Sequence, residues 1–592
     1  MSFMERHKRP PGQSGAFGAT LLNDGTACFR FWAPALQHVE LVIEGQDPIK
    51  MDRLENGWFE VTAPCRAGAA YRYKVDETLM VADPAARAMR GDAFGDSLVW
   101  DPQAYVWKTP KWKGRPWHEA VFYELHVGAF GGFSGVQDAL PRLVSLGVTA
   151  VELMPVNAFP GERNWGYDGV LPYAPSSSYG TPDDLKALID RAHELGIMMF
   201  LDVVYNHFGP EGNFIGIYAP PFFRRDVHNA WGRAIDFRRQ EVRRFYTENA
   251  LYWLQEFRFD GLRFDAVHAI THPDWLDETA AEIRGALPSD RYVHFVLEND
   301  NNIASHMREG YFSAQWNDDA HHVLHVLLTG ETGSYYVDYA ENPAAKLARS
   351  LSEGFIFQGE PSINRGGEPR GTPSGGLRPQ CFVSFLQNHD QVGNRAFGER
   401  LTELTEPRAL EAAIALQLLT PHIPLLFMGE EDASKNPFLF FSETNEQLAH
   451  SIREGRKREF KLEAEELPDP NAIESFEKST PLPDPRLGGR RFRYYQALLA
   501  LRRETISPFI PEARTLGAHA IADKAVISRW RLGNGSTLTI AINLGDESVD
   551  CLAPSDPLLF ESVAGAHETL RRGKLAANST VALLTEDKPD RT

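Results

Sequence analysis

The stretch "GLRFDAVHAI", Gly261 to Ile270, is a short apolar run that ends in polar residues. Because the side chains of a strand alternate between two faces, Arg263 and Asp265 share one face. An arginine beside an aspartate favours the ionised acid, which suits a carboxylate that acts as a nucleophile at neutral pH. A buried ion pair that only fixes the end of a strand is the alternative, and this stretch alone does not separate the two interpretations.

From about residue 120, apolar runs of this kind alternate with amphipathic stretches, and each run ends in acidic, amide or imidazole side chains. The eight runs are "VFYELHV", "GVTAVELMPV", "IMMFLDVVYNH", "RFDGLRFDAVHAI", "YVHFVLEND", "YFSAQWNDDAHH", "CFVSFLQNHDQ" and "IPLLFMGEE". Eight such units predict a closed (β/α)8 TIM barrel with its site at the carboxyl ends of the strands. A doubly wound open sheet is less favoured, because no glycine-rich phosphate loop follows Val127.

The segments on either side of this barrel show the alternation typical of half-buried strands. In "HVELVIEG" and "YRYKVDE" every second residue is apolar, and the same pattern returns between Leu538 and Ile542. We therefore predict a multidomain protein with an N-terminal β-sandwich at 1–105, a catalytic barrel at 106–508 and a small C-terminal β-domain at 509–592.

Two sets of aromatic residues are candidates for sugar stacking. Trp32, Trp58 and Tyr71 could form a platform on the N-terminal domain, but core residues are the favoured interpretation. The segment 209–238 is long and aromatic, as expected of a loop over a barrel mouth, although self-packing is an equal alternative for each ring. The aromatic residues considered are Phe214, Tyr218, Phe222, Phe223 and Trp231. The segment 359–379, rich in Gly, Pro and Arg, is predicted to be a surface flap.

Composition excludes several classes of protein. With 43% hydrophobic and 24% charged residues among 592, and no apolar run near the roughly 18 residues of a membrane span, we expect a soluble protein. The first residues, "MSFMERHKRPPGQSG", lack the apolar core of a secretory signal. Four cysteines without metal-ligand spacing predict reduced thiols in a cytoplasmic protein. The net charge of −19 disfavours nucleic acid and anionic lipid as partners and favours a neutral substrate.

Three acids follow three different apolar runs, so the barrel would bring Asp265, Glu298 and Asp390 to one rim. Such a set suits glycoside chemistry, in which one carboxylate attacks the anomeric carbon and a second protonates the leaving oxygen. Asp265, beside Arg263, is expected to stay ionised, whereas Glu298 among other acids is expected to have a raised pKa. A divalent cation site is the weaker alternative, because the acids lack paired-ligand spacing. We predict no metal and no cofactor.

Four motifs carry a resemblance to the α-amylase superfamily of glycoside hydrolases: "DVVYNH", "GLRFDAVHAI", "FVLEND" and "FLQNHD". The resemblance implies a retaining mechanism with Asp265 as nucleophile, Glu298 as acid/base and Asp390 as the residue that holds and distorts the sugar. It also implies a substrate-binding set in and beside the motifs. That set is Tyr167, Asp202, His207, Arg263, His268, Asn388, His389 and Gln391, and packing is the alternative role for Tyr167.

Longer matches extend the resemblance to one family within this class. "NWGYDGVLPYAPSSSYG", "AQWNDDAHHVLHVLLTGET", "PLLFMGEE" and "FRFWAP" resemble the maltooligosyltrehalose trehalohydrolase family, which cleaves the α-1,4 bond next to a terminal trehalose and releases trehalose. The chain departs from the family pattern in a shortened segment after Val127 and in the absence of a tryptophan after "MGEE". By the same resemblance, the trehalose side of the cleft is expected to include Asp318, His321, Glu430 and Glu431.

Residue chemistry alone leaves the substrate open. Water and a sugar hydroxyl can resolve the same covalent intermediate, so a glycogen branching or debranching enzyme is the alternative. A non-catalytic glucan-binding protein is a remote alternative, since it would need one of the three acids to be missing.

Overall fold

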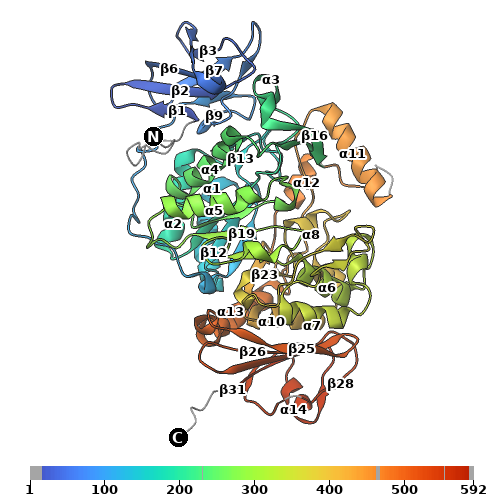
Figure 1. Cartoon of the computed structure of the whole chain (residues 1–592). Coiled ribbons are helices and arrows are strands. Elements are labelled where there is room, and N and C mark those ends of the chain that lie inside the picture. Colours follow the sequence, from blue (N-terminus) through green and yellow to red (C-terminus); the bar gives the residue numbers. More distant parts are fainter. Residues whose placement is uncertain (1–16, 230, 462–466, 553, 586–592) are drawn as a thin grey trace.

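The computed structural model describes residues 17–229, 231–461, 467–552 and 554–585. Figure 1 shows three parts in a row: antiparallel sheets near the amino terminus, a barrel surrounded by helices, and an antiparallel sheet near the carboxyl terminus. This arrangement confirms the predicted fold class. The domain limits predicted from the sequence remain predictions.

The N-terminal part consists of two antiparallel sheets, with strand orders β1-β2-β6-β5 and β4-β3-β7-β10-β9. Their longer strands are β1 (Gly18–Leu21), β2 (Thr26–Trp32), β3 (Glu40–Ile43), β6 (Trp58–Pro64) and β7 (Ala70–Lys74). The shorter ones are β4 (Ile49–Lys50), β5 (Asp52–Arg53), β9 (Ala88–Arg90) and β10 (Asp96–Leu98). The predicted alternation holds, because Leu41 and Ile43 are fully buried. Trp32 and Tyr71 are buried as well, which agrees with a packing role and leaves no platform of three rings for sugar.

The central part is a closed barrel of eight parallel strands, and each strand lies inside one of the eight predicted runs. In barrel order these are β11 (Phe122–Leu125), β12 (Ala150–Leu153), β15 (Met198–Val203), β18 (Gly261–Phe264), β19 (His294–Leu297), β20 (Ala314–Trp316), β23 (Phe382–Phe385) and β24 (Ile423–Phe427). The interior is a packed core that includes Phe122, Phe200, Trp316 and Phe385, as expected for a barrel of this size. The site must therefore lie above this core, at the carboxyl ends of the strands.

Helices cover the outside of the barrel. The main ones are α1 (Gly132–Leu146), α2 (Pro182–Glu194), α4 (Gln240–Gln255), α5 (Asp274–Ala286), α6 (Asp318–Thr329), α7 (Pro343–Glu353), α10 (Pro407–Leu419) and α13 (Gly488–Thr505). Local sequence explains where α2 begins: Thr181 and Asp184 form a capping box and Pro182 occupies the first turn, a position that needs no backbone N–H. No helix within the described ranges is long and apolar enough to cross a membrane.

The C-terminal sheet has the strand order β25-β26-β27-β31-β29. Its strands are β25 (Arg514–Ala522), β26 (Ala525–Arg531), β27 (Thr537–Asn543), β29 (Leu558–Glu561) and β31 (Ser579–Thr585). Both faces of β27 are buried, and Thr539 has no exposed surface. The face of the sheet opposite the barrel belongs to a second apolar cluster, which includes Ala541, Leu570 and Val581. The Thr580 hydroxyl donates to the Ala412 carbonyl oxygen of α10 at 2.8 Å, so the sheet is joined to the barrel helices.

The two long insertions differ from their predictions. Segment 209–238 contains α3 (Ile215–Tyr218) and a hairpin of β16 (Phe223–Asn229) and β17 (Gly232–Ile235). Among the aromatic residues of this segment only Trp231 is exposed, at 45%. Tyr218, Phe222 and Phe237 are buried, and Phe214 and Phe223 are partly buried. Segment 359–379 is not a free flap, since its Arg370 is only 4% exposed and is held by acids of the barrel.

Candidate active site

Asp265 follows β18 directly, and both of its carboxylate oxygens are occupied. Arg263 Nη1 donates to Asp265 Oδ1 at 2.8 Å, and Asn206 Nδ2 donates to Asp265 Oδ2 at 2.8 Å. The Arg263 guanidinium is fully buried and lies 4.1 Å from the centre of the Trp316 ring. A carboxylate held at both oxygens has a fixed orientation, which a nucleophile requires.

The same guanidinium holds a second acid, Asp202, at the end of β15. Arg263 Nη1 is 2.6 Å from Asp202 Oδ2, and the Tyr167 hydroxyl donates to the same oxygen at 2.5 Å. Burial raises the pKa of Asp202 to about 7, although the charge of Arg263 opposes this shift. Arg263, Asp202 and Tyr167 therefore meet, as predicted, beside Asp265.

Glu298 follows β19 and approaches the same group of residues. The Ala266 backbone N–H donates to Glu298 Oε2, and Arg263 Nη2 lies 3.5 Å from that oxygen. Ala266 has φ 40° and ψ 47°, a left-handed conformation that is rare for alanine and common at functional sites. Burial raises the pKa of Glu298 above its ordinary value, Arg263 opposes the shift, and the charge of Asp265 adds to it.

Asp390 and His389 begin α8 (His389–Gly393), which follows β23. His389 Nε2 is 3.5 Å from Asp390 Oδ1, and the imidazole stacks on the Tyr167 ring with centroids 4.9 Å apart. Burial lowers the pKa of His389, but Asp390 and Glu124 outweigh it and raise the pKa to about 9. The Asp390 side chain is 39% exposed, and its charge contributes to the raised pKa of Glu298. The three predicted acids are thus brought to one site.

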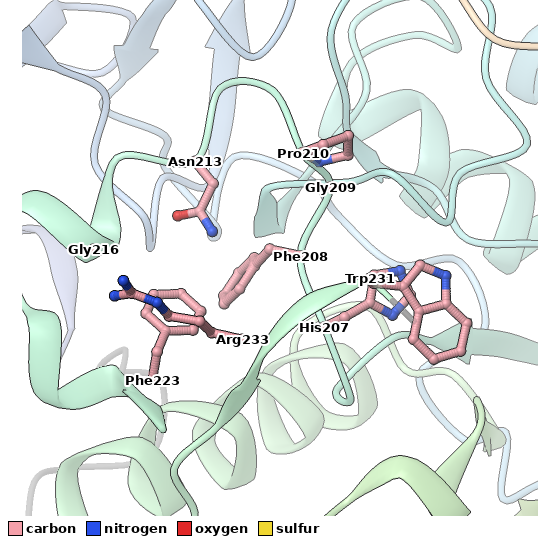
Figure 2. A pocket seen from close by; sticks show the side chains of 9 residues that line it. All are labelled: His207, Phe208, Gly209, Pro210, Asn213, Gly216, Phe223, Trp231 and Arg233. Atoms are coloured by element: carbon pink, nitrogen blue, oxygen red, sulfur yellow. The ribbon is translucent and has the colours of Figure 1, made fainter. Parts of the chain in front are cut away.

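His207 lies at the edge of this site, under the hairpin of β16 and β17. Its Nε2 is 3.0 Å from the Tyr167 carbonyl oxygen, and the exposed Trp231 ring stacks on it with centroids 4.4 Å apart. Both rings line a cavity of about 250 Å³, to which Phe208, Asn213, Phe223 and Arg233 also contribute. Figure 2 shows the Trp231 indole beside the His207 imidazole. Trp231 thus places an exposed aromatic ring of the long insertion beside His207.

Asp318, the first residue of α6, lies on the other side of the acids. Gln391 Nε2 is 3.4 Å from Asp318 Oδ1, and the Tyr335 hydroxyl donates to Gln391 Oε1 at 3.2 Å. Burial, followed by the charge of Glu298, raises the pKa of Asp318 well above its ordinary value. Asp318 and Gln391 therefore line the site together.

Two further residues of the predicted substrate-binding set have local partners. Asn388 caps α8, because its Oδ1 accepts the Gln391 backbone N–H at 2.8 Å. His268 accepts the Asp300 backbone N–H at 3.4 Å, next to Glu298.

The ring and hydrogen-bond partners of His321, Glu430 and Glu431 lie outside the group of residues around Arg263, and their place on the trehalose side of the cleft stays a prediction. His321 is 2% exposed and packs on Phe385 with ring centroids 5.6 Å apart.

Glu430 accepts from the Tyr495 hydroxyl of α13 at 3.0 Å, and Glu431 accepts from the Tyr123 hydroxyl of β11 at 3.0 Å. Arg142 of α1 lies 3.5 Å from Glu431. The chain turns at Gly429, with φ 89°, so both glutamates contact the helical layer around the barrel.

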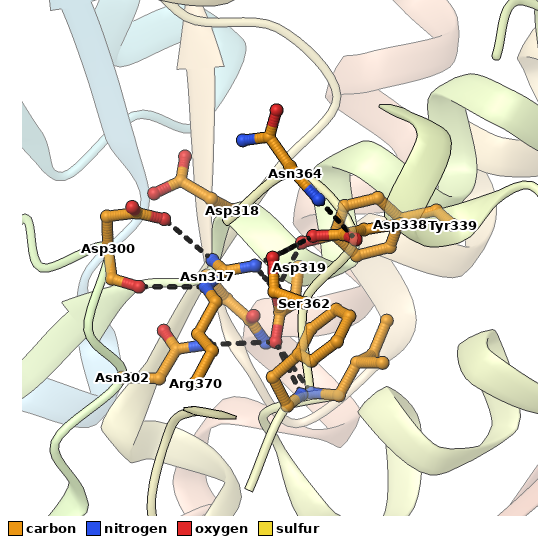
Figure 3. A network of polar contacts seen from close by, with 12 residues as sticks. Asp300, Asn302, Asn317, Asp318, Asp319, Asp338, Tyr339, Ser362, Asn364 and Arg370 are labelled. Carbon is orange, nitrogen blue, oxygen red and sulfur yellow. Dashed lines mark hydrogen bonds and ion pairs between the residues drawn. The ribbon is translucent and has the colours of Figure 1, made fainter. Parts of the chain in front are cut away.

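A second polar network, which the sequence did not reveal, holds segment 359–379 beside Glu298 (Figure 3). Arg370 Nη2 is 3.0 Å from Asp300 Oδ1, and Arg370 Nη1 is 3.1 Å from Asp319 Oδ1. Asp319 also accepts the Ile356 backbone N–H at 2.7 Å, while Asp338 accepts the Ile363 backbone N–H at 2.6 Å. The two acids that begin α6, Asp318 and Asp319, and the arginines of the insertion are the sequence signals of this network.

The described residues contain no group of three or more His, Cys, Asp or Glu side chains arranged to hold a metal ion. Three carboxylates at the mouth of a closed parallel barrel, one of them fixed by a buried arginine and another with a raised pKa, define a glycoside hydrolase of the α-amylase class. In agreement, residues 97–219 match the family "Alpha amylase, catalytic domain", and residues 513–583 match a domain of unknown function, DUF3459.

Relatives identify the family within this class. The malto-oligosyltrehalose trehalohydrolase of Deinococcus radiodurans is 39% identical, over 82% of this chain and 83% of its own length. The chain therefore belongs to the malto-oligosyltrehalose trehalohydrolase family. A solved structure from Salmonella typhimurium, provisionally described as an alpha amylase, is 41% identical with a TM-score of 0.91, and the match covers 96% of this chain and all of that one. A branching enzyme of Thiobacillus denitrificans matches only 46% of this chain, at 34% identity.

Proposed function

We propose that the protein is a retaining glycoside hydrolase that cleaves the α-1,4-glucosidic bond adjacent to the terminal trehalose of maltooligosyltrehalose and releases trehalose. The names of its full-length relatives support this reaction. The partial match to a branching enzyme does not favour glucan transfer. Maltooligosyltrehalose and related α-glucans are the proposed substrates.

In the proposed mechanism, Asp265 attacks the anomeric carbon of the glucosyl unit that precedes trehalose. Its two oxygens are held by Arg263 and Asn206, so the attack needs little rotation of the carboxylate. Glu298 gives its proton to the leaving oxygen and then takes a proton from the water that hydrolyses the glucosyl ester. The convergence of Asp265 and Glu298 on one buried guanidinium, 2.8 Å and 3.5 Å from its nitrogens, is the observation that carries this proposal.

Asp390 and His389 are proposed to hold the hydroxyls of the glucosyl unit in the transition state. Tyr167 lies under this unit, since its ring already stacks on His389. These contacts accelerate the reaction only if they are stronger in the transition state, in which the sugar ring is flattened, than in the bound substrate.

Asp318 with Gln391 is proposed to contact the trehalose side of the cleft. A buried carboxyl with a raised pKa can donate a hydrogen bond to a sugar hydroxyl as well as accept one. Because a buried polar group that loses its partner costs free energy, such contacts discriminate between sugars that differ in one hydroxyl position.

The four cysteines form no disulfide, which suits the reducing environment of the cytoplasm.

One assay tests the proposed reaction. Purified protein is incubated with maltooligosyltrehalose and, separately, with a plain maltooligosaccharide of equal length, and free trehalose and α-1,6 linkages are measured. We expect trehalose from the first substrate and no α-1,6 linkages from either. New α-1,6 linkages, or trehalose release by the Asp265→Asn variant at the wild-type rate, would contradict the proposal.

A further inference from the structure

Glu124, at the end of β11, makes two hydrogen bonds to the residue before Asp390. The His389 backbone N–H donates to Glu124 Oε2 at 3.0 Å, and His389 Nδ1 donates to Glu124 Oε1 at 2.5 Å. The side chains of Glu124 and His389 are each 1% exposed. Since β11 and β23 are not neighbours in the barrel, this contact ties the start of α8 to a strand two positions away.

The contact fixes both the position and the hydrogen-bonding pattern of His389. Two N–H donors meet two carboxylate oxygens, so the ring nitrogen Nδ1 keeps its proton and Nε2 faces Asp390 at 3.5 Å. Tyr167 stacks on one face of the ring and the edge of Trp165 contacts it at a centroid distance of 5.6 Å. The imidazole therefore has no other orientation that satisfies the same partners.

Several ionisable groups surround His389, and they come from different elements. They are Glu124 from β11, His126 from the loop after it, Glu152 from β12, Tyr167 from the loop before β14 (Leu171–Pro175), Asp202 from β15, Arg263 from β18 and Asp390 from α8. Among them only Glu124 bonds directly to Nδ1. Its removal would therefore change the protonation of His389 more than removal of any other acid except Asp390.

We propose that Glu124 is a positioning residue, which acts through His389 to hold Asp390 and the imidazolium in place for the sugar at the cleaved bond. This inference rests on the proposed roles of Asp390 and His389. It assigns a task in the reaction to a barrel residue that neither the four motifs nor the three acids include.

Glu152 offers a matched control for Glu124. It is the residue paired with Glu124 on the adjacent strand β12, and each is 1% exposed. Both carboxylate oxygens of Glu152 lack a hydrogen-bond partner within the described part of the chain. Replacing Glu152 by glutamine thus changes a buried acid at the same depth without breaking a bond to His389.

The test is a double-mutant cycle of Glu124→Gln and His389→Asn, with Glu152→Gln as control. Glutamine offers one acceptor oxygen where glutamate offers two, so His389 must accept from the new amide at Nδ1 and lose its charge. We expect Glu124→Gln to lower kcat by about 10- to 100-fold, the range typical of a misplaced reacting group, with a small change in KM. In the His389→Asn background we expect the same substitution to have little further effect.

The pH profile gives a second readout, which a purely structural role would not move. In the wild type, burial lowers the pKa of His389, but Asp390 and Glu124 outweigh it and raise the pKa to about 9. In Glu124→Gln one of these two acids is removed, so the pKa of His389 should fall. We therefore expect the variant to lose activity at a lower pH than the wild type.

Three outcomes would overturn the proposal. The first is a double variant whose loss of kcat equals the product of the losses in Glu124→Gln and His389→Asn. The others are a pH profile of Glu124→Gln identical to that of the wild type, or a loss of kcat in Glu152→Gln equal to that in Glu124→Gln. Melting temperatures of all variants separate these outcomes from misfolding. If the wild type cleaved plain maltooligosaccharides and released no trehalose, the proposed function would fail, and the same cycle on that α-1,4 bond would still decide the role of Glu124.

Discussion

Two pairs of acids that follow barrel strands differ in their partners, and the proposed mechanism uses only one of the pairs. Asp265 and Glu298 follow β18 and β19, and both contact the buried Arg263. Glu430 and Glu431 follow β24, are more deeply buried than Asp265 and Glu298, and have pKa values raised to about 8 and about 7. A raised pKa after a barrel strand is therefore not enough to identify a catalytic acid, because the partners of the carboxylate decide its role.

The strongest test of this difference is Asp265→Asn. An amide cannot form the glucosyl ester, so we expect kcat on maltooligosyltrehalose to fall by about a thousandfold or more. The melting temperature checks that the variant is folded. A variant that kept a tenth of the wild-type rate would remove Asp265 from the proposed mechanism.

Glu298→Gln should have the next largest effect. Loss of the leaving-group proton is expected to lower kcat by about 10²- to 10⁴-fold on the natural substrate. With α-glucosyl fluoride the loss in the first step should be much smaller, because fluoride leaves without protonation. Burst kinetics with the two substrates measure the contrast, and equal losses on both would exclude Glu298 as the acid.

Asp318→Ala probes the site at its trehalose side. If Asp318 contacts trehalose, its removal costs about 1–3 kcal/mol in binding discrimination, which is roughly 5- to 150-fold. The quantity to measure is kcat/KM for maltooligosyltrehalose divided by kcat/KM for a plain maltooligosaccharide. An unchanged ratio would show that Asp318 does not select the substrate.

Glu430→Gln should change activity least. Its partner is Tyr495 in the helical layer, so we expect kcat within about threefold of the wild type, as for a substitution that leaves the reacting groups in place. A tenfold loss of kcat in a variant with wild-type thermal stability would contradict the distinction between the two pairs of acids. Glu431→Gln provides a neighbouring control.

The same variant makes a prediction about stability and pH. The folded-state pKa of Glu430 is raised to about 8 from an ordinary value of 4.5, so the stability that its protonated form contributes is complete below about pH 4.5 and is lost as the pH rises towards 8. Glutamine does not titrate. The melting temperature of Glu430→Gln minus that of the wild type should therefore increase between pH 5 and pH 8, as measured by thermal unfolding.

The sequence predicted the barrel well because each strand is an apolar run followed by polar residues, and it predicted Asp265, Glu298 and Asp390 as neighbours because strand ends share one rim. It could not predict the direction of Glu430 and Glu431. That direction depends on the turn at Gly429 and on Tyr495, 65 residues away in the chain.

Glu124 and Arg370 were missed for a related reason. Their partners His389, Asp300 and Asp319 are distant in sequence, and no periodic pattern marks a pair of this kind.

The N-terminal sheets contribute to the cleft indirectly. Tyr218, in the insertion that carries Trp231, packs on Phe31 of β2 with ring centroids 4.6 Å apart, and the Ala35 backbone N–H donates to the Tyr218 carbonyl oxygen at 3.1 Å. These sheets therefore support the insertion that carries the hairpin of β16 and β17, and they are not packed independently of it. A shortened enzyme that began at the barrel would expose the apolar underside of this insertion, and we expect it to aggregate before it showed any change in substrate preference.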